Sequence, residues 1–217
     1  MKGLLIKDLR LMVKQQKIFS SVVFIAVLLA VVTGNTFFII SYMTFVASLF
    51  TLTSISYDEF DNGNAFLFSL PITRRMYVKE KYGVAMLLGG GLWVVSTVFA
   101  VAVGEMKKTV PMGDTLIAAC GILPIMLVML AVMLPVQLKY GGEKGRMATI
   151  VIIGGVFVLA IVLARAAQWL GIDVEEFLEK LQMMDAGTGV AVAVAVAAVA
   201  LLVSVRASIS IMEKKEF

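Results

Sequence analysis

Six long apolar runs dominate this chain of 217 residues and restrict it to membrane folds. A helix needs roughly 20 apolar residues to cross the hydrocarbon core of a bilayer. Charged residues make up only 16% of the sequence, below the roughly 25% that is typical of soluble domains. We therefore predict an all-α polytopic membrane protein with six transmembrane helices. The predicted spans cover about residues 18–33, 36–56, 84–103, 115–137, 148–164 and 188–205.

The basic residues are divided unevenly between the two sides of these spans. If the N-terminus is cytoplasmic, 15 of the 19 Lys and Arg residues lie on the cytoplasmic side. Because cytoplasmic loops carry an excess of Lys and Arg, we expect both termini to be cytoplasmic. The residues on that side are Lys2, Lys7, Arg10, Lys14, Lys17, Arg74, Arg75, Lys79, Lys81, Lys139, Lys144, Arg146, Arg206, Lys214 and Lys215.

Two amphipathic segments lie outside the spans of the single transmembrane domain, residues 18–217. In residues 1–17, Leu5 and Leu9 share one helical face and basic residues share another, which predicts a helix along the inner membrane surface. A basic flank that only orients the first span is the alternative. Residues 172–184 carry an apolar stripe on an acidic background. We expect an extracellular helix there, at the outer interface or in a lid, or else a solvated connector.

The cytoplasmic loop 57–82 holds more charge than a plain connector needs. An acidic patch, Tyr57–Asp61, is followed by the apolar segment Ala65–Leu70, which is too short to span a membrane. Pro71 is then expected to begin a helix that carries the basic residues. An apolar surface bordered by charges of both signs is typical of a protein-docking site. An interfacial helix that only anchors the loop explains the same pattern.

No catalytic motif stands out in the sequence. The absence of G-x-x-x-x-G-K-[ST] means that the chain does not carry its own P-loop, and the absence of His excludes His-based metal sites and bases. The span centres are nearly free of charge, whereas proton-coupled pumps keep ionisable residues there. We therefore expect a chain that is not an enzyme, binds no metal or cofactor itself, and receives energy from elsewhere.

Two span faces have a distinctive composition. Hydroxyl groups follow one face of residues 36–56, and methionines recur on one face of residues 115–137. Close helix packing and core filling explain these patterns. Alternatively, these two faces line a pathway for apolar ligands of variable shape, which is a more specific hypothesis. The candidate pathway-lining residues are Ser41, Thr44, Ser48, Thr51, Met126 and Met133.

Four stretches, taken together and in order, carry a family resemblance over the whole chain. They are Met1–Leu9, Ser69-Leu-Pro-Ile-Thr-Arg-Arg75 followed by Val78 and Lys81-Tyr82, Leu134-Pro135 with Lys139-Tyr-Gly-Gly-Glu-Lys-Gly-Arg146, and Ile211–Phe217. These stretches resemble the ABC-2 type permeases, the membrane subunits of bacterial ABC exporters. Within that family the chain most resembles the short permeases of exporters for phenol-soluble modulins and similar amphipathic peptides.

The resemblance implies a half-transporter with a type V exporter-like transmembrane fold in the bacterial cell membrane. Two such permease chains, identical or different, pair with two ATPase subunits, which supply the ATP and Mg site. The coupling helix of the family corresponds to about residues 58–75. The ATPase-coupling residues implied are Asp58, Glu59, Phe66, Phe68, Leu70, Pro71, Arg74 and Arg75. Those implied for a second cytoplasmic contact are Lys139, Glu143, Lys144 and Arg146.

The expected function is therefore that of a permease subunit of an ATP-driven exporter of amphipathic or hydrophobic peptides, such as toxins or antimicrobial peptides. A peptide-immunity or sensor protein in the membrane that needs no ATPase is the alternative. An intramembrane enzyme is disfavoured because acid–base groups are lacking. No nucleic-acid partner is expected.

Overall fold

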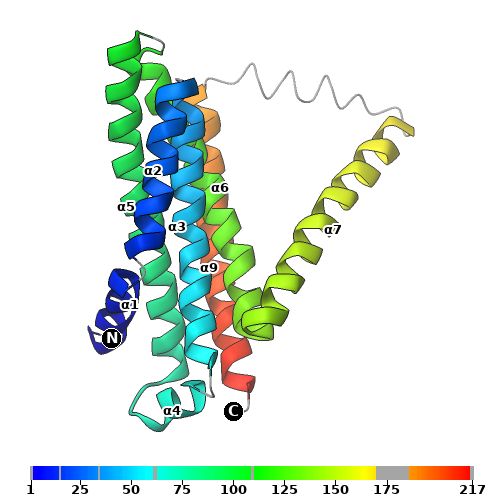
Figure 1. Ribbon diagram of the computed structural model, residues 1–217. Coiled ribbons are helices and arrows are strands. Elements are labelled where there is room, and N and C mark those ends of the chain that lie inside the picture. Colours follow the sequence, from blue (N-terminus) through cyan, green and yellow to red (C-terminus); the bar gives the residue numbers. More distant parts are fainter. Residues whose placement is uncertain are drawn as a thin grey trace.

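The computed structural model describes residues 2–14, 16–33, 35–60, 63–108, 110–169 and 186–215, and every regular element in these ranges is helical (Figure 1). The predicted extracellular helix at residues 172–184 lies outside the described residues. In chain order the helices are α1 (Lys2–Lys14), α2 (Gln16–Thr33), α3 (Thr36–Glu59), α4 (Gly63–Ser69), α5 (Arg74–Lys107), α6 (Met112–Tyr140), α7 (Gly142–Trp169) and α9 (Ala186–Lys214).

Among the described residues, the helices α3, α5, α6 and α9 are long and apolar enough to cross a membrane. They coincide with four of the predicted spans, so the chain is a multi-pass membrane protein. The other two predicted spans, residues 18–33 and 148–164, lie in α2 and α7. The apolar stretches found there among the described residues, Ser20–Leu29 and Met147–Val156, are shorter. The count of six spans and the side of the termini stay predictions.

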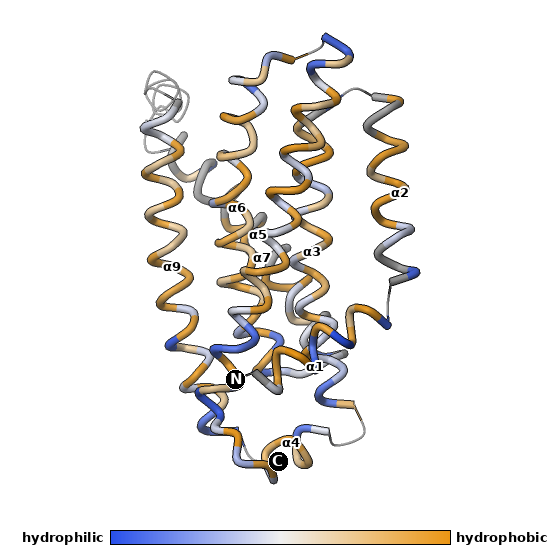
Figure 2. The backbone as a smooth tube through the Cα atoms, turned by 90° about the vertical axis from the view of Figure 1, so that its left-hand side faces the viewer, coloured by the Kyte–Doolittle hydropathy of each residue, from blue (hydrophilic) through white to orange (hydrophobic). Residues whose placement is uncertain are grey.

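Both described chain ends lie at the same end of the helix bundle, together with α1, α4 and the turn between α6 and α7 (Figure 1). Hydrophilic residues gather at this end, whereas apolar residues line most of the length of the long helices (Figure 2). The 34 residues of α5 extend about 51 Å at 1.5 Å per residue. A hydrocarbon core is only about 30 Å thick, so α5 is longer than such a core is thick. We use the name terminal end for the end of the bundle that holds α1, α4, the α6–α7 turn and both described chain ends (Figure 1).

Side-chain caps set the start of two of the long helices. The Asn35 side chain accepts a hydrogen bond from the Phe38 amide at 3.1 Å and begins α3. The Thr73 hydroxyl accepts one from the Met76 amide at 3.2 Å and begins α5. Such caps satisfy backbone donors that have no partner inside the helix. The expectation that Pro71 begins this helix is therefore wrong, because the Thr73 cap places the start at Arg74.

The helices pack most extensively as α6 against α9 and α3 against α5. A core cluster at the terminal end joins all four, with Ile55 from α3, Tyr77 from α5, Leu134 from α6 and Met212 from α9. α7 leans away from this bundle after its first turns (Figure 1). An apolar groove of about 920 Å³ opens between α6, α7 and α9.

The turn between α6 and α7 is closed by glycines. The amide of Gly141 donates to the Gln137 carbonyl at 2.9 Å, and its φ of +82° ends α6 in a conformation that favours glycine. In the first turn of α7, a Cβ on Gly145 would lie 2.5 Å from Gln137 Oε1 and 3.3 Å from the Gln137 Cα. A larger residue at position 145 would therefore have to displace the Gln137 side chain.

We expect Gly145→Val to lower the free energy of unfolding by about 1–3 kcal/mol, because the added atoms must displace Gln137. Gly154→Val, in the same helix, is the control, since nothing lies within 4 Å of the position that a Cβ would take there. The measurement is equilibrium unfolding in detergent micelles. Equal losses in the two variants would mean that valine acts through helix propensity and not through the α6–α7 contact.

Candidate functional site

α4 forms the outermost structure of the terminal end, below the ends of α3 and α5 (Figure 1). Its packing divides the three predicted apolar contact residues. Phe66 is 71% exposed and Leu70 is 44% exposed, whereas Phe68 turns inward and packs edge-on against Tyr77 at 5.6 Å between ring centroids. Pro71 is exposed. The outward apolar surface is therefore built on Phe66 and Leu70.

A groove of about 520 Å³ separates α4 from α1. Leu4 and Lys7 of α1 line one side, and Phe66, Leu70 and Pro71 line the other. The N-terminal helix therefore borders the apolar surface of α4, although the two segments are far apart in the sequence.

The two predicted arginines have different environments. Arg74 Nη1 donates to the carbonyl oxygens of Met212 at 2.6 Å and Glu213 at 3.2 Å, and its guanidinium lies 5.8 Å from the centre of the Phe68 ring. A cation is favourable at the C-terminal end of a helix such as α9. Arg75 has a side chain that is 70% exposed and pairs with Glu213 at 2.6 Å. Arg74 thus holds α9, and Arg75 remains at the surface.

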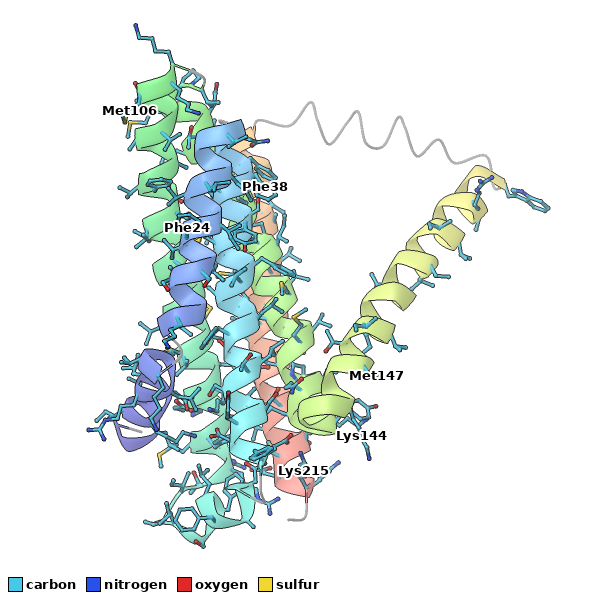
Figure 3. The ribbon with its side chains drawn as sticks, in the orientation of Figure 1. Phe24, Phe38, Met106, Lys144, Met147 and Lys215 are labelled. Carbon is cyan, nitrogen blue, oxygen red and sulfur yellow. The ribbon has the colours of Figure 1, made fainter. Side chains whose placement is uncertain are left out.

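Glu59 also holds the end of α9. Its carboxylate accepts a hydrogen bond from Lys215 Nζ at 2.9 Å, and the same ammonium donates to the Leu138 carbonyl of α6 at 3.0 Å. Figure 3 shows Lys215 at the terminal end beside these helices. This contact joins α3, α6 and α9 directly behind α4.

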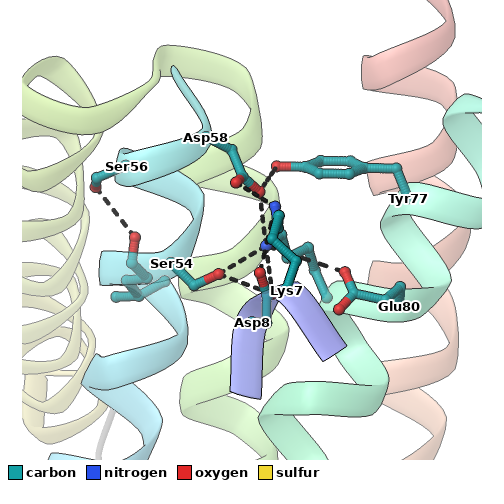
Figure 4. A network of polar contacts seen from close by, with 9 residues as sticks. Lys7, Asp8, Ser54, Ser56, Asp58, Tyr77 and Glu80 are labelled. Carbon is teal, nitrogen blue, oxygen red and sulfur yellow. Dashed lines mark hydrogen bonds and ion pairs between the residues drawn. The ribbon is translucent and has the colours of Figure 1, made fainter. Parts of the chain in front are cut away.

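Asp58 lies in a buried cluster of ionic groups between α1, α3 and α5 (Figure 4). At its centre the Lys81 ammonium, which is fully buried, contacts Asp8 at 2.5 Å and Asp58 at 2.7 Å. Lys7 forms a further ion pair with Asp58. The cluster therefore holds two lysines and two aspartates, and these four charges balance.

Hydroxyl groups add further hydrogen bonds to this cluster. Ser54 donates to Asp8 at 2.8 Å and accepts from Lys81 at 2.7 Å. The Tyr77 hydroxyl donates to Asp58 at 3.1 Å. Burial raises the pKa of the Asp8 carboxyl, but the charge and hydrogen bond of Lys81, together with Lys7 and Ser54, outweigh burial, so the pKa of Asp8 is lowered. Asp8 is thus held as a carboxylate.

Sequence reasoning missed this cluster, except for Asp58. Asp8 is the one acidic residue in the basic segment 1–17, and Lys81 adjoins the apolar start of the predicted span 84–103. Each residue is unusual for its segment, and this is the one sequence feature that indicated a special role for it. The two residues belong to different helices, so their pairing was not visible in either segment.

The predicted second cytoplasmic contact lies at the α6–α7 turn of the same end. Lys139 and Lys144 are exposed there, and Figure 3 shows Lys144 at the outer side of the turn. The side chains of Glu143 and Arg146 lie outside the described ones. Gln137 fixes the turn against α3 by donating to the Ser56 hydroxyl at 3.0 Å. The α6–α7 turn therefore contacts the end of α3, the helix that precedes α4 in the chain.

Five of the six predicted pathway residues line two cavities, and Thr51 lines neither. Ser41, Thr44, Ser48 and Met126 line one apolar cavity of about 270 Å³ between α3 and α6, next to three aromatic rings. Met133 lines the larger groove beside α7. Thr51 is fully buried, and its hydroxyl, like that of Thr44, has no hydrogen-bond partner among the described residues. Four of the six residues are thus brought together.

A comparison with protein-family models matches residues 3–213 to the family described as ABC-2 family transporter protein. The chain belongs to the ABC-2 transporter family. Comparisons with curated proteins and with solved structures gave no match. Membership means that this chain is a membrane permease of an ABC transporter and associates with an ATPase subunit.

For this ABC-2 permease, the terminal end has the features of a docking surface. The outward residues are Phe66 on α4, Leu70 directly after α4, and Arg75 at the start of α5. The inward residues Asp58, Glu59 and Arg74 bind α4 and its flanking helices to α1, α6 and α9. With Pro71 exposed and Phe68 turned inward, the eight residues that were predicted as one group divide into four at the surface and four behind it.

Proposed function

We propose that this ABC-2 permease is the membrane subunit of an ATP-driven exporter of amphipathic or hydrophobic peptides in the bacterial plasma membrane. The cavity between α3 and α6 supports an amphipathic cargo, because aromatic rings and methionines line it together with serine and threonine side chains. The resemblance to permeases for phenol-soluble modulins supports the same class of cargo.

The observation that carries this proposal is the exposed apolar surface of α4. Phe66 and Leu70 project from an end of the bundle that is otherwise rich in charge. An apolar centre with a charged rim is the usual anatomy of a protein interface. We infer that an ATPase subunit docks here, with ATP and Mg bound in that partner, and that this chain is not itself an enzyme.

In the proposed cycle, two permease chains pair and each receives one ATPase. ATP binding closes the ATPase pair and displaces α4. Because ion pairs and hydrogen bonds join α3, α5, α6 and α9 behind α4, these helix ends move together. The packed helices then rock between two discrete arrangements, as in other hinge and shear transitions. The cavity between α3 and α6 is exposed first to one side and then to the other.

Inverted membrane vesicles that contain the permease and its co-expressed ATPase test this function. A fluorescent amphipathic α-helical peptide is added outside with ATP. We expect ATP-dependent accumulation in the lumen, which requires both subunits and an ATPase with an intact P-loop. A charged, non-amphipathic peptide of equal length is the control. Peptide binding by the permease alone, unchanged by nucleotide, would instead support the immunity or sensor function.

A further inference from the structure

Glu80 is a third buried carboxyl at the ionic cluster. The two lysines of the cluster already balance the charges of Asp8 and Asp58, so no lysine remains to balance Glu80. Its side chain is 1% exposed and points toward α1 (Figure 4). Both of its oxygens lack a hydrogen-bond partner among the described residues. The nearest ammonium, Lys81, is 4.0 Å away and already contacts Asp8, Asp58 and Ser54.

A charged Glu80 would give this cluster a net negative charge inside the protein. The facing charged and titratable groups are Lys7 and Asp8 from α1, Asp58 from α3, and Tyr77 and Lys81 from α5 itself. Two lysines and two aspartates already balance. An uncompensated buried charge costs several kcal/mol, and a buried carboxyl avoids this cost by taking up a proton.

A second unsatisfied atom lies on the facing helix. Asp8 Oδ1 is buried and has no hydrogen-bond partner among the described residues, although the Lys7 ammonium is 3.3 Å away. Asp8 and Glu80 each have an oxygen next to the Lys81 ammonium, at 2.5 Å and 4.0 Å from its Nζ, so the two carboxyl groups are neighbours. A proton on one Glu80 oxygen would provide a donor for Asp8, so that this oxygen and Asp8 Oδ1 would both gain a partner. One proton therefore resolves the excess charge and the missing hydrogen bond together.

We propose that Glu80 binds a proton and donates it in a hydrogen bond to Asp8, so that the packing of α1 against α5 is linked to proton binding. When α1 separates, Lys7 and Asp8 leave together. Glu80 then meets water, where a glutamate is ionised at neutral pH because water solvates its charge. The packed state thus binds one more proton than the separated state, and lower pH favours packing of α1.

Infrared spectroscopy of the full-length permease in lipid nanodiscs, without ATPase, tests for this proton. At neutral pH we expect a carbonyl band of a protonated carboxyl that is lost in Glu80→Gln. Asp8→Asn should also abolish the band, because Lys7 and Lys81 then face only Asp58, and Glu80 ionises to balance them. Glu105→Gln, an exposed carboxyl in the same helix, should leave the band unchanged. Retention of the band in Asp8→Asn would overturn the proposal.

Thiol labelling measures the linked motion of α1. In a Cys120→Ala background, Met12→Cys reports packing because Met12 is buried against Phe50 and Val84, and Val13→Cys, 66% exposed, corrects for thiol reactivity. We expect the ratio of the two rates to rise with pH, by up to about tenfold per pH unit for one linked proton. Glu80→Gln should make the ratio small and independent of pH. An unchanged pH dependence in that variant would contradict the linkage.

This inference rests on the cluster geometry and does not depend on the proposed export function. Failure of the vesicle experiment would leave the infrared result intact. Because α1 lines the groove beside α4, a proton that controls the packing of α1 also controls one wall of the surface that we assign to the ATPase.

Discussion

Lys81→Met is expected to lower the free energy of unfolding by about 3–5 kcal/mol, among the largest losses that a single substitution in this chain can cause. The methionine side chain has a similar length but no charge. Asp8 and Asp58 would then face each other across a buried site with Lys7 as the one remaining ammonium of the cluster. Breaking a buried ion pair on one side leaves the other charge without compensation.

Equilibrium unfolding in detergent micelles measures this loss, and two further variants identify its cause. Lys79→Met removes an exposed charge two residues away and should cost less than about 0.5 kcal/mol. The double variant Lys81→Met/Asp8→Asn leaves Lys7 opposite Asp58, so the charges balance again. We expect it to be more stable than Lys81→Met, which means that the two substitutions are not additive. If the double variant were less stable than Lys81→Met, the charge balance would not be the cause.

Phe66→Ala combined with Leu70→Ala is expected to weaken binding of the ATPase subunit by at least about 30-fold, while the permease stays folded. Large apolar residues at the centre of an interface each contribute about 2 kcal/mol or more, and 1.4 kcal/mol corresponds to a tenfold change in Kd. Both side chains are substantially exposed in the permease alone, so the substitutions remove little of its own packing. Titration of nanodisc-embedded permease with purified ATPase gives the Kd.

Two controls separate docking from folding in this experiment. Met106→Ala changes an 85% exposed apolar residue at the opposite end of α5 (Figure 3) and should leave the Kd unchanged. Phe68→Ala removes the ring that packs on Tyr77 and lies under Arg74, so we expect it to lower the unfolding free energy. A docking defect in Phe68→Ala that matches the double variant, with unchanged stability, would place the interface on the inner face of α4.

Much of the helical architecture could be predicted because it depends on local sequence. Uninterrupted apolar runs predicted the helices that became α3, α5, α6 and α9, since a chain in lipid must satisfy its backbone hydrogen bonds within each helix. α1 lies within the basic amphipathic segment 1–17. The start of α5 was misplaced, because a cap depends on the geometry of one hydroxyl and the sequence around Pro71 offered a competing signal.

The candidate site was predictable in position but not in arrangement. Charge in the loop 57–82 indicated a functional segment, and α4 lies there. Helical periodicity on two spans selected six candidate pathway residues. Ser41, Thr44, Ser48 and Met126 share a cavity, whereas Thr51 and Met133 do not line it. The same reasoning treated Phe68 like Phe66 and Arg74 like Arg75, although each pair has one inward and one outward member. Residues one or two positions apart in a helix point in different directions, and only the packing of Tyr77 and α9 decides which member of each pair is buried.

The sequence by itself determined that this protein is a multi-helix membrane permease of the ABC-2 family, because apolar length and local motifs are properties of contiguous residues. The tertiary structure decided how charge is handled at the terminal end. Asp8, Asp58, Glu80 and Lys81 come from three helices, and no local pattern relates the first of them to the others. Their energies arise from burial and from distances of a few ångströms, which exist only once α1, α3 and α5 have packed.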